Sequence, residues 1–201
     1  MMHPLVSNNI EAIAYGSIAR GDVSEDSDID VFLPRPPTAT IIETTLERHN
    51  VAFAEREIVQ ATPSYVAKGY IYVDERRSYS FPLVDMRTVE LEFYSFAGSV
   101  NARQIDGGVR VPGVDKHLMF IEPTARGHVE FSVTGREGVV AKDLGISATT
   151  VLDRVRTLRR RDRIGRTGVF IKRTLAPEES FGEVFQQLSM DRPAVRRRLR
   201  A

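Results

Sequence analysis

Two aspartates one residue apart, Asp28 and Asp30, open an apolar run in the segment from Ala14 to Leu33, AYGSIARGDVSEDSDIDVFL. Side chains at positions i and i+2 of a strand point to the same face, so we expect these carboxylates to lie together. Carboxylate oxygens are the ligands that hard divalent cations such as Mg²⁺ prefer. A divalent ion held there could stabilise charge on phosphoryl oxygens during a displacement at phosphorus. The spacing therefore predicts metal-assisted chemistry on a phosphate ester or anhydride.

A Gly-Ser pair with a basic residue after it stands upstream of the two aspartates. Gly16 allows the backbone to turn sharply and to approach a ligand closely. The Ser17 hydroxyl and the Arg20 guanidinium are hydrogen-bond donors that suit phosphate oxygens. We expect these three residues to bind the phosphates of a nucleotide.

Two other ion- or phosphate-binding loops do not fit the segment. A calcium loop with ligands at residues 26, 28 and 30 needs glycine at position 31 and glutamate at position 37, where the chain has Val31 and Pro37. A phosphate-binding loop of the Walker type needs Gly-Lys followed by Ser or Thr, and the segment lacks it. A solvated acidic loop would not need the Gly-Ser pair.

The segment GSIARGDVSEDSDIDVFL resembles the signature of the DNA polymerase β-like nucleotidyltransferase superfamily, and is closest to the small archaeal and bacterial minimal nucleotidyltransferases. The resemblance covers about residues 10–97. It implies that Gly16 and Ser17 contact the triphosphate of a nucleoside triphosphate, and that Asp28 and Asp30 ligate Mg²⁺ or Mn²⁺. Arg20 stands where members often carry a basic residue.

The resemblance also implies a third carboxylate on a later strand, between apolar neighbours. The alternating segment TVELEFYSF, residues 88–96, predicts such a strand, and both Glu90 and Glu92 have the required neighbours. We prefer Glu92 as catalytic residue and metal ligand because an apolar pair follows it, with Glu90 as the alternative and Asp85 as a lesser candidate. Glutamate is less usual than aspartate at this place.

The activity that the resemblance implies is nucleotidyl transfer. An acceptor hydroxyl attacks the α-phosphorus of the triphosphate and releases pyrophosphate, while the third carboxylate accepts the hydroxyl proton. The acceptor could be a nucleic acid or a protein. Two alternatives are a nucleic-acid-binding regulator with a degenerate nucleotidyltransferase fold, and a toxin–antitoxin component that nucleotidylates its partner.

An α/β fold is predicted to position these residues, with a small mixed sheet and flanking helices over residues 1–97. Short apolar or alternating runs predict strands over residues 10–17, 27–33 and 51–59. Apolar side chains at helical spacing predict a helix over residues 38–50, with Thr38 or Thr40 as its N-cap.

The later half of the chain predicts a β-rich arm over residues 98–133, a winged-helix-like module over 134–176 and a basic tail over 177–201. In the module, two helices meet at a turn at Gly145, Ser147 caps the second helix, and residues 163–173 form the wing as a hairpin. The buried stripe of the second helix is predicted to contain Val151, Leu152, Val155 and Leu158. The outward residues predicted to contact nucleic acid are Thr149, Thr150, Arg154, Arg156, Arg166 and Lys172.

Composition sets the remaining limits. The chain has 201 residues, of which 42% are hydrophobic and 27% charged, within the ordinary range of globular proteins. It has no cysteine, which excludes disulfides and thiolate metal sites, and its four histidines lack the spacing of metal ligands. No apolar stretch reaches the roughly 18 residues of a membrane span, and no signal-peptide pattern opens the chain. We therefore expect a cytoplasmic protein without a membrane segment.

Overall fold

The computed structural model describes residues 1–165 and 168–199. The chain divides into two compact units that interleave along the sequence. The first unit contains residues 1–13, 30–86 and 168 onward, and the second contains residues 14–29 and those from 87 up to the gap at 166. Among the described residues, no helix combines the length and the apolar character that a bilayer crossing requires.

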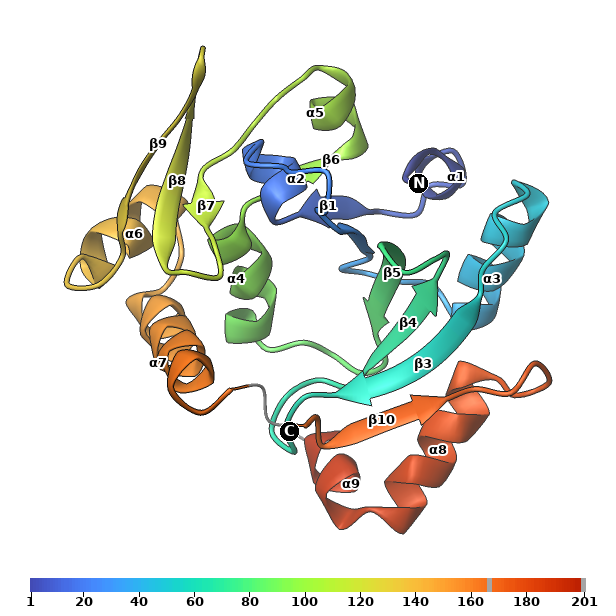
Figure 1. The fold of residues 1–201 in the computed structure, drawn as a ribbon. Coiled ribbons are helices and arrows are strands. Elements are labelled where there is room, and N and C mark those ends of the chain that lie inside the picture. The colour runs from blue at the N-terminus through green and yellow to red at the C-terminus, as the bar shows by residue number, and fades with distance from the viewer. Residues whose placement is uncertain (166–167, 200–201) are drawn as a thin grey trace. The chain divides into compact units, whose positions relative to one another are not determined.

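The first unit is built on a sheet with the strand order β10-β3-β4-β5-β2 (Figure 1). Neighbouring strands from β10 to β5 pair antiparallel. The predicted strands over 27–33 and 51–59 are confirmed as β2 and β3. The bounds are β2 (Ile29–Phe32), β3 (Glu55–Gln60), β4 (Lys68–Tyr72), β5 (Arg77–Pro82) and β10 (Ile171–Thr174).

One face of this sheet is apolar and packs against helices. Ile58, Ile71 and Tyr79 are fully buried, and the ring of Phe81 lies 5.1 Å from that of Phe181 in α8. Gly69 of β4 permits this packing, because a Cβ there would lie 2.6 Å from the Phe81 ring. The helices of the unit are α1 (His3–Val6), α3 (Ala39–Arg48), α8 (Phe181–Asp191) and α9 (Pro193–Leu199). The predicted helix over 38–50 is thus confirmed as α3.

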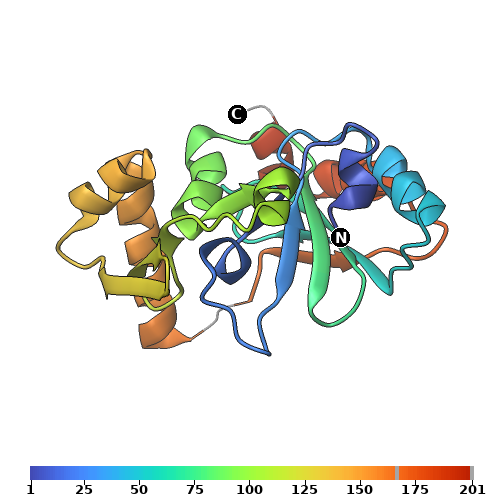
Figure 2. The ribbon, with the colours of Figure 1, turned by 90° about the horizontal axis from the view of Figure 1, so that it is seen from above.

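The second unit begins at Ala14, within β1 (Ile13–Tyr15). It contains a three-stranded antiparallel sheet. Its hairpin of β8 and β9 lies within the predicted β-rich arm over residues 98–133. Helices α6 and α7 lie side by side next to that hairpin (Figures 1 and 2). The remaining bounds are α2 (Ser17–Arg20), α4 (Thr88–Ala97), β6 (Ser99–Asn101), α5 (Ala102–Asp106), β7 (Gly113–Val114), β8 (Met119–Thr124), β9 (Gly127–Ser132), α6 (Glu137–Leu144) and α7 (Ala148–Ile164).

The core of the second unit joins α4, α6, α7 and the three-stranded sheet. Phe96 of α4, Val140 of α6 and Val155 of α7 are buried together in this core. Their neighbours are Val114, Leu118, Phe120, Val133, Ala141, Val151 and Leu158. Gly113 lets β7 pass close to the end of α4, because a Cβ there would lie 2.6 Å from the backbone of Ala97.

The predicted strand over residues 88–96 is wrong, because Thr88–Ala97 is helix α4. Its buried residues include Glu90, Tyr94 and Ala97, which recur at intervals of four and three, the spacing of one helix face. The Glu90 carboxylate accepts a hydrogen bond from the backbone N–H of Arg87 (2.8 Å), which fixes the start of the helix. The alternation of apolar and acidic residues over 88–96 therefore does not indicate a strand.

The predicted wing is also wrong where the structure describes it. Ile171–Thr174 is β10, and it pairs antiparallel with β3 in the first unit, with Lys172 opposite Val59. This pairing supplies β3 with a neighbour on its outer side and buries Ile171. Arg166, the other predicted wing residue, lies outside the described residues. The consecutive segments 1–97, 98–133, 134–176 and 177–201 consequently do not coincide with the two interleaved units.

Candidate active site

The Gly-Ser pair forms an open turn between β1 and α2. Gly16 has φ 79° and ψ −142°, a backbone conformation that residues with a Cβ rarely adopt. Its N–H donates to the carbonyl of Gly98 (2.9 Å), which fixes the turn, and a Cβ placed on it would meet no heavy atom within 4 Å. Ser17 follows as the first residue of α2 and is half-buried. The turn therefore has room for a ligand beside Gly16.

Arg20 makes several contacts within the second unit, and its contact with phosphate stays a prediction. Its guanidinium is buried and donates to the backbone carbonyl of Ala97 at 2.6 Å. The same group forms an ion pair with Asp22 at 2.9 Å, and its side chain lies against Gly98. These contacts tie α2 to the C-terminal end of α4, so Arg20 supports the turn at Gly16.

The two aspartates differ in their surroundings. Asp28 is exposed and directly precedes β2, whereas Asp30 lies within β2 and is half-buried. One oxygen of the Asp30 carboxylate, Oδ1, accepts a hydrogen bond from the hydroxyl of Ser78 at 2.6 Å. Ser78 belongs to the neighbouring strand β5 and is 5% exposed. A buried hydroxyl thus fixes the orientation of the second carboxylate of the pair.

Polar side chains continue from Asp30 across one face of the sheet in the first unit. Ser78 and Ser80 of β5 stand opposite Tyr72 and Tyr70 of β4, whose rings stack with centroids 5.9 Å apart. Burial raises the pKa of Tyr70 to about 12, and the negative charge of Asp30 adds to the effect. The Tyr70 phenol therefore lies within range of the negative charge of Asp30.

A buried carboxylate, Glu57 of β3, ends this polar row. It is 2% exposed and accepts from the ammonium of Lys172 and the hydroxyl of Thr174, both at 3.1 Å. Burial, and then the charge of Glu57, raise the pKa of Tyr72. Lys172 thus neutralises Glu57 in the first unit, and its contact with nucleic acid stays a prediction.

Glu90 and Glu92, the predicted third carboxylates, hold the starts of helices. Glu90 is buried at the start of α4 and forms an ion pair with Arg87 at 3.1 Å. Glu92 accepts from the backbone N–H of Ser147 (3.2 Å) and from the hydroxyl of Thr150, at the N-terminus of α7. A carboxylate at a helix N-terminus satisfies unpaired N–H groups and favours the helix dipole. Both side chains therefore stabilise the starts of helices in the second unit.

Across residues 1–165 and 168–199, the structure gathers no group of three or more histidine, aspartate or glutamate side chains that could hold a metal ion. The site with three carboxylates stays a prediction. Asp28 and Asp30 still fit a divalent cation by donor type, since both offer hard carboxylate oxygens and Ser78 orients one of them. Asp85, the lesser candidate, is exposed, and its backbone carbonyl accepts from Arg198.

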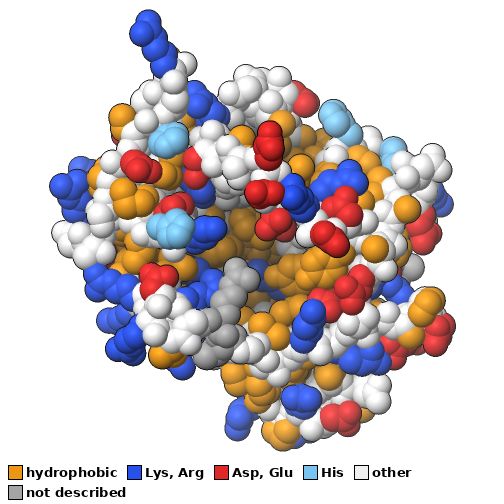
Figure 3. Space-filling view, viewed as in Figure 1, with side chains coloured by type: hydrophobic (Ala, Val, Ile, Leu, Met, Phe, Trp, Pro, Cys, Tyr) orange, Lys and Arg blue, Asp and Glu red, His pale blue; other side chains and the backbone are white. Residues whose placement is uncertain are grey.

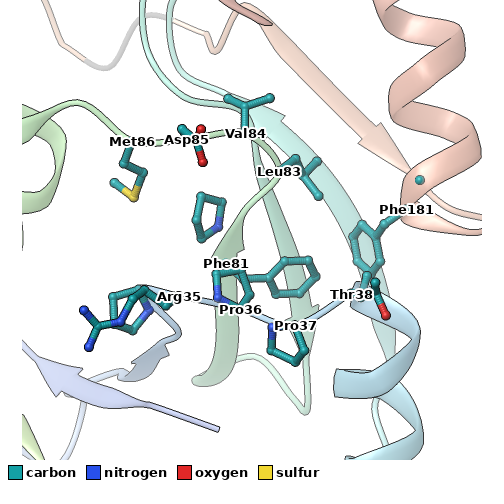
Figure 4. A pocket seen from close by; sticks show the side chains of 14 residues that line it. Arg35, Pro36, Pro37, Thr38, Phe81, Leu83, Val84, Asp85, Met86 and Phe181 are labelled. Atoms are coloured by element: carbon teal, nitrogen blue, oxygen red, sulfur yellow. The ribbon is translucent and has the colours of Figure 1, made fainter.

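A separate cavity of about 630 Å³ lies within the first unit (Figure 4). Its lining comes from the proline-rich segment after β2, the end of β5 and the start of α8, and includes Pro36, Leu83, Asp85 and Phe181. Neither Asp30 nor Ser78 lines it. The cavity is thus distinct from the residues predicted to bind the nucleotide.

Helices α6 and α7 form the predicted helix pair, although its outward residues differ from the prediction. Gly145 takes the left-handed conformation (φ 64°) after α6, and the Ser147 hydroxyl caps α7 by accepting from the N–H of Thr150. Thr149 and Arg156 are exposed as predicted. Thr150, however, is fully buried on Glu92, and Arg154 stacks over the ring of Phe93 at 4.8 Å. Leu152, expected in the buried stripe, is 41% exposed.

Comparison with known proteins gave one family match. Residues 3–84 match the model of a family described as "Nucleotidyltransferase domain". Neither the comparison with curated proteins nor the comparison with solved structures gave a match. The matched range includes Gly16, Ser17, Asp28, Asp30 and Ser78, and ends before Glu90 and Glu92. This part of the chain, fewer than half of its 201 residues, is therefore similar to nucleotidyltransferase domains.

Proposed function

We propose that the protein transfers a nucleoside monophosphate from a nucleoside triphosphate to an acceptor hydroxyl, with a divalent cation held by Asp28 and Asp30. The observation that carries this proposal is the Ser78 hydrogen bond to Asp30 (2.6 Å), within the residues that match the nucleotidyltransferase model. A buried hydroxyl that fixes a carboxylate is typical of the supporting contacts around a metal ligand.

The residues of the Gly-Ser turn bind the triphosphate. Gly16 allows the phosphates to approach its backbone, because the space where a side chain would stand is open. Ser17 donates its hydroxyl to a phosphate oxygen. Arg20 keeps this turn in place through the carbonyl of Ala97. Base selectivity is not expected from these contacts, since they address phosphates only.

The reaction forms a bond between the acceptor oxygen and the α-phosphorus and breaks the bond to pyrophosphate, while the hydroxyl proton passes to solvent water. Mg²⁺ or Mn²⁺, when bound, supplies positive charge for the phosphoryl oxygens. Asp30, oriented by Ser78, and the exposed Asp28 supply the carboxylate oxygens that hold the ion. In this arrangement Glu92 stabilises α7 and has no part in the chemistry.

The test is label transfer in the presence of possible acceptors. The purified protein is incubated with each of the four α-labelled nucleoside triphosphates, Mg²⁺ and a cell extract, and the products are digested separately with nuclease and protease. We expect label in one class of macromolecule, lost with EDTA or with Asp30→Asn. Label in a protein would favour the toxin–antitoxin alternative. Nucleotide binding without any transfer would contradict the enzyme and favour a regulator.

A further inference from the structure

Helix α7 carries an exposed row of arginines along one side. Arg156, Arg159, Arg160 and Arg163 are exposed, and they follow the exposed Leu152 at intervals of three and four residues, the spacing of one helix face. We call these four arginines the arginine row. Neither acid of the helix, Asp153 or Asp162, occupies these positions. Blue side chains gather over α7 in Figure 3, in agreement with this pattern.

The arginine row is mounted on a fixed helix. Val151, Val155 and Leu158 bury another side of α7 in the core of the second unit. The N-terminus of the helix is held by the Ser147 cap and by Glu92. Positions 156 and 160 lie about 6 Å apart along the axis, and 156 and 163 about 10.5 Å apart. Exposed guanidinium groups at these intervals form a continuous positive edge.

One member of the row is already engaged. Arg159 donates to the hydroxyl of Thr134 (3.0 Å). Arg156, Arg160 and Arg163 are therefore the members most suited to an outside partner. Guanidinium groups bind phosphate oxygens with two parallel hydrogen bonds, so the chemistry of the row fits a polyphosphate backbone.

We propose that the arginine row binds the phosphate backbone of double-stranded DNA, without dependence on base sequence. α7 has no aromatic residue, so it offers no platform on which unstacked bases of a single strand could lie. It is the second helix of a helix-turn-helix pair and is exposed along the row, as a helix entering the major groove of B-form DNA must be. The deep, narrow major groove of double-stranded RNA does not admit side chains in this way.

The test is fluorescence anisotropy of the full chain with a labelled DNA duplex at several salt concentrations. The variant Arg156→Gln/Arg160→Gln/Arg163→Gln removes three charges from the row. The control variant Arg48→Gln/Arg103→Gln/Arg196→Gln removes three exposed charges elsewhere, so both variants have the same net charge. A double-stranded RNA and a single DNA strand of the same sequence serve as competing ligands.

We expect the row variant to bind duplex DNA at least about tenfold more weakly at 50 mM salt, and its log–log salt slope to be shallower by about 2–3, for three lost phosphate contacts. The control variant should bind like the natural chain, and both variants should keep the natural circular dichroism spectrum. Equal losses in both variants would show that net charge alone is responsible and would overturn the proposal. The absence of duplex binding at 50 mM salt, or tighter binding of RNA or single strands, would also overturn it.

Discussion

Asp30 differs from an ordinary strand carboxylate because a buried side chain on the next strand holds it. The Ser78 hydroxyl donates to the Oδ1 atom at 2.6 Å, and Ser78 itself is 5% exposed. A hydrogen bond from a neutral donor to an ionised acceptor is stronger than one between neutral groups. The contact fixes the direction in which the carboxylate faces a cation, and makes Ser78 a positioning residue for the proposed metal.

Ser78→Ala should therefore weaken the binding of Mn²⁺, followed by electron paramagnetic resonance, and lower kcat about tenfold, as expected for a lost hydrogen bond to a charged group. Ser78→Thr, which keeps a hydroxyl, should retain part of the Mn²⁺ binding and part of kcat. Ser80→Ala is the matched control. Ser80 lies on the same strand, two residues on, and its buried hydroxyl has no hydrogen-bond partner within the described part of the chain. Equal effects of the two alanine variants would contradict a specific role for Ser78.

Tyr70 gives a prediction about alkaline pH. Its pKa is raised to about 12 by burial and by Asp30, while an unfolded tyrosine titrates near 10. The folded state holds this proton more tightly, so the stabilisation is complete below pH 10 and is lost as the pH rises toward 12. The urea concentration at half unfolding should decrease as the pH is raised from 9.5 to 11.5, and it should decrease less in Tyr70→Phe. An identical fall in both proteins would contradict the shifted pKa of Tyr70.

The residues of the site were only partly predictable. Gly16, Ser17, Asp28 and Asp30 could be chosen because they form one short motif, and their spacing indicates the chemistry directly. Ser78 could not, because its role depends on which strand lies beside β2, and β5 was not predicted from the sequence. The burial of Arg20 against Ala97 could not be predicted either, because it depends on a helix almost 80 residues later.

At the scale of elements, Glu92 joins α4 to α7. Its carboxylate accepts from the Ser147 N–H and the Thr150 hydroxyl, at the point where α7 has unpaired backbone donors. A catalytic Glu92, as the resemblance implies, would lose activity on substitution. A Glu92 that holds the start of α7 would instead lose stability.

Glu92→Gln should lower the free energy of unfolding by about 1 kcal/mol, the usual effect of weakening a helix cap, and leave kcat unchanged. Urea titration and the transfer assay measure the two effects. Thr150→Val should destabilise the protein similarly, and the double variant should be less destabilised than the sum, because both substitutions remove the same contact. A large loss of kcat with unchanged stability would contradict this role and support Glu92 as a catalytic residue.

Elements with caps and helical spacing were predicted well, and elements that depend on distant partners were not. α3, α6 and α7 follow from their own residues, as do the hairpin strands β8 and β9. Residues 88–97 alternate like a strand but bury a helical face, and Ile171–Thr174 reads as half of a hairpin but pairs with β3. In both cases the neighbour that decides the structure lies far away in the sequence.

For the whole molecule, the chief finding is that each unit is assembled from separate parts of the chain. The first unit requires β10, α8 and α9, whose residues follow position 168. Phe181 of α8 covers the ring of Phe81 on the apolar face of the sheet (5.1 Å). A boundary at residue 97, as the sequence suggests, would expose that face.

A fragment of residues 1–97 is accordingly expected not to fold by itself. It would leave Phe81 and Ile58 without the helix and strand that cover them, although both are buried in the full chain. Urea unfolding followed by circular dichroism should show no cooperative transition for the fragment, in contrast to the full chain. A cooperative transition and dispersed NMR signals from the fragment would contradict the interleaved units.

Nucleotidyl transfer through Asp28 and Asp30 can be measured by following the two ends of the triphosphate separately. Nucleoside triphosphate labelled at the α- or the γ-phosphate is incubated with the protein, Mg²⁺ and an extract that contains the acceptor. We predict that α-label enters the acceptor while γ-label leaves as pyrophosphate in equal amount. Asp28→Asn and Asp30→Asn should each lower both signals at least about a hundredfold and keep the natural melting temperature, since they remove charges that bind the ion and open no cavity. Undiminished transfer in either variant, or release of γ-label as inorganic phosphate without α-label in any acceptor, would contradict the claim.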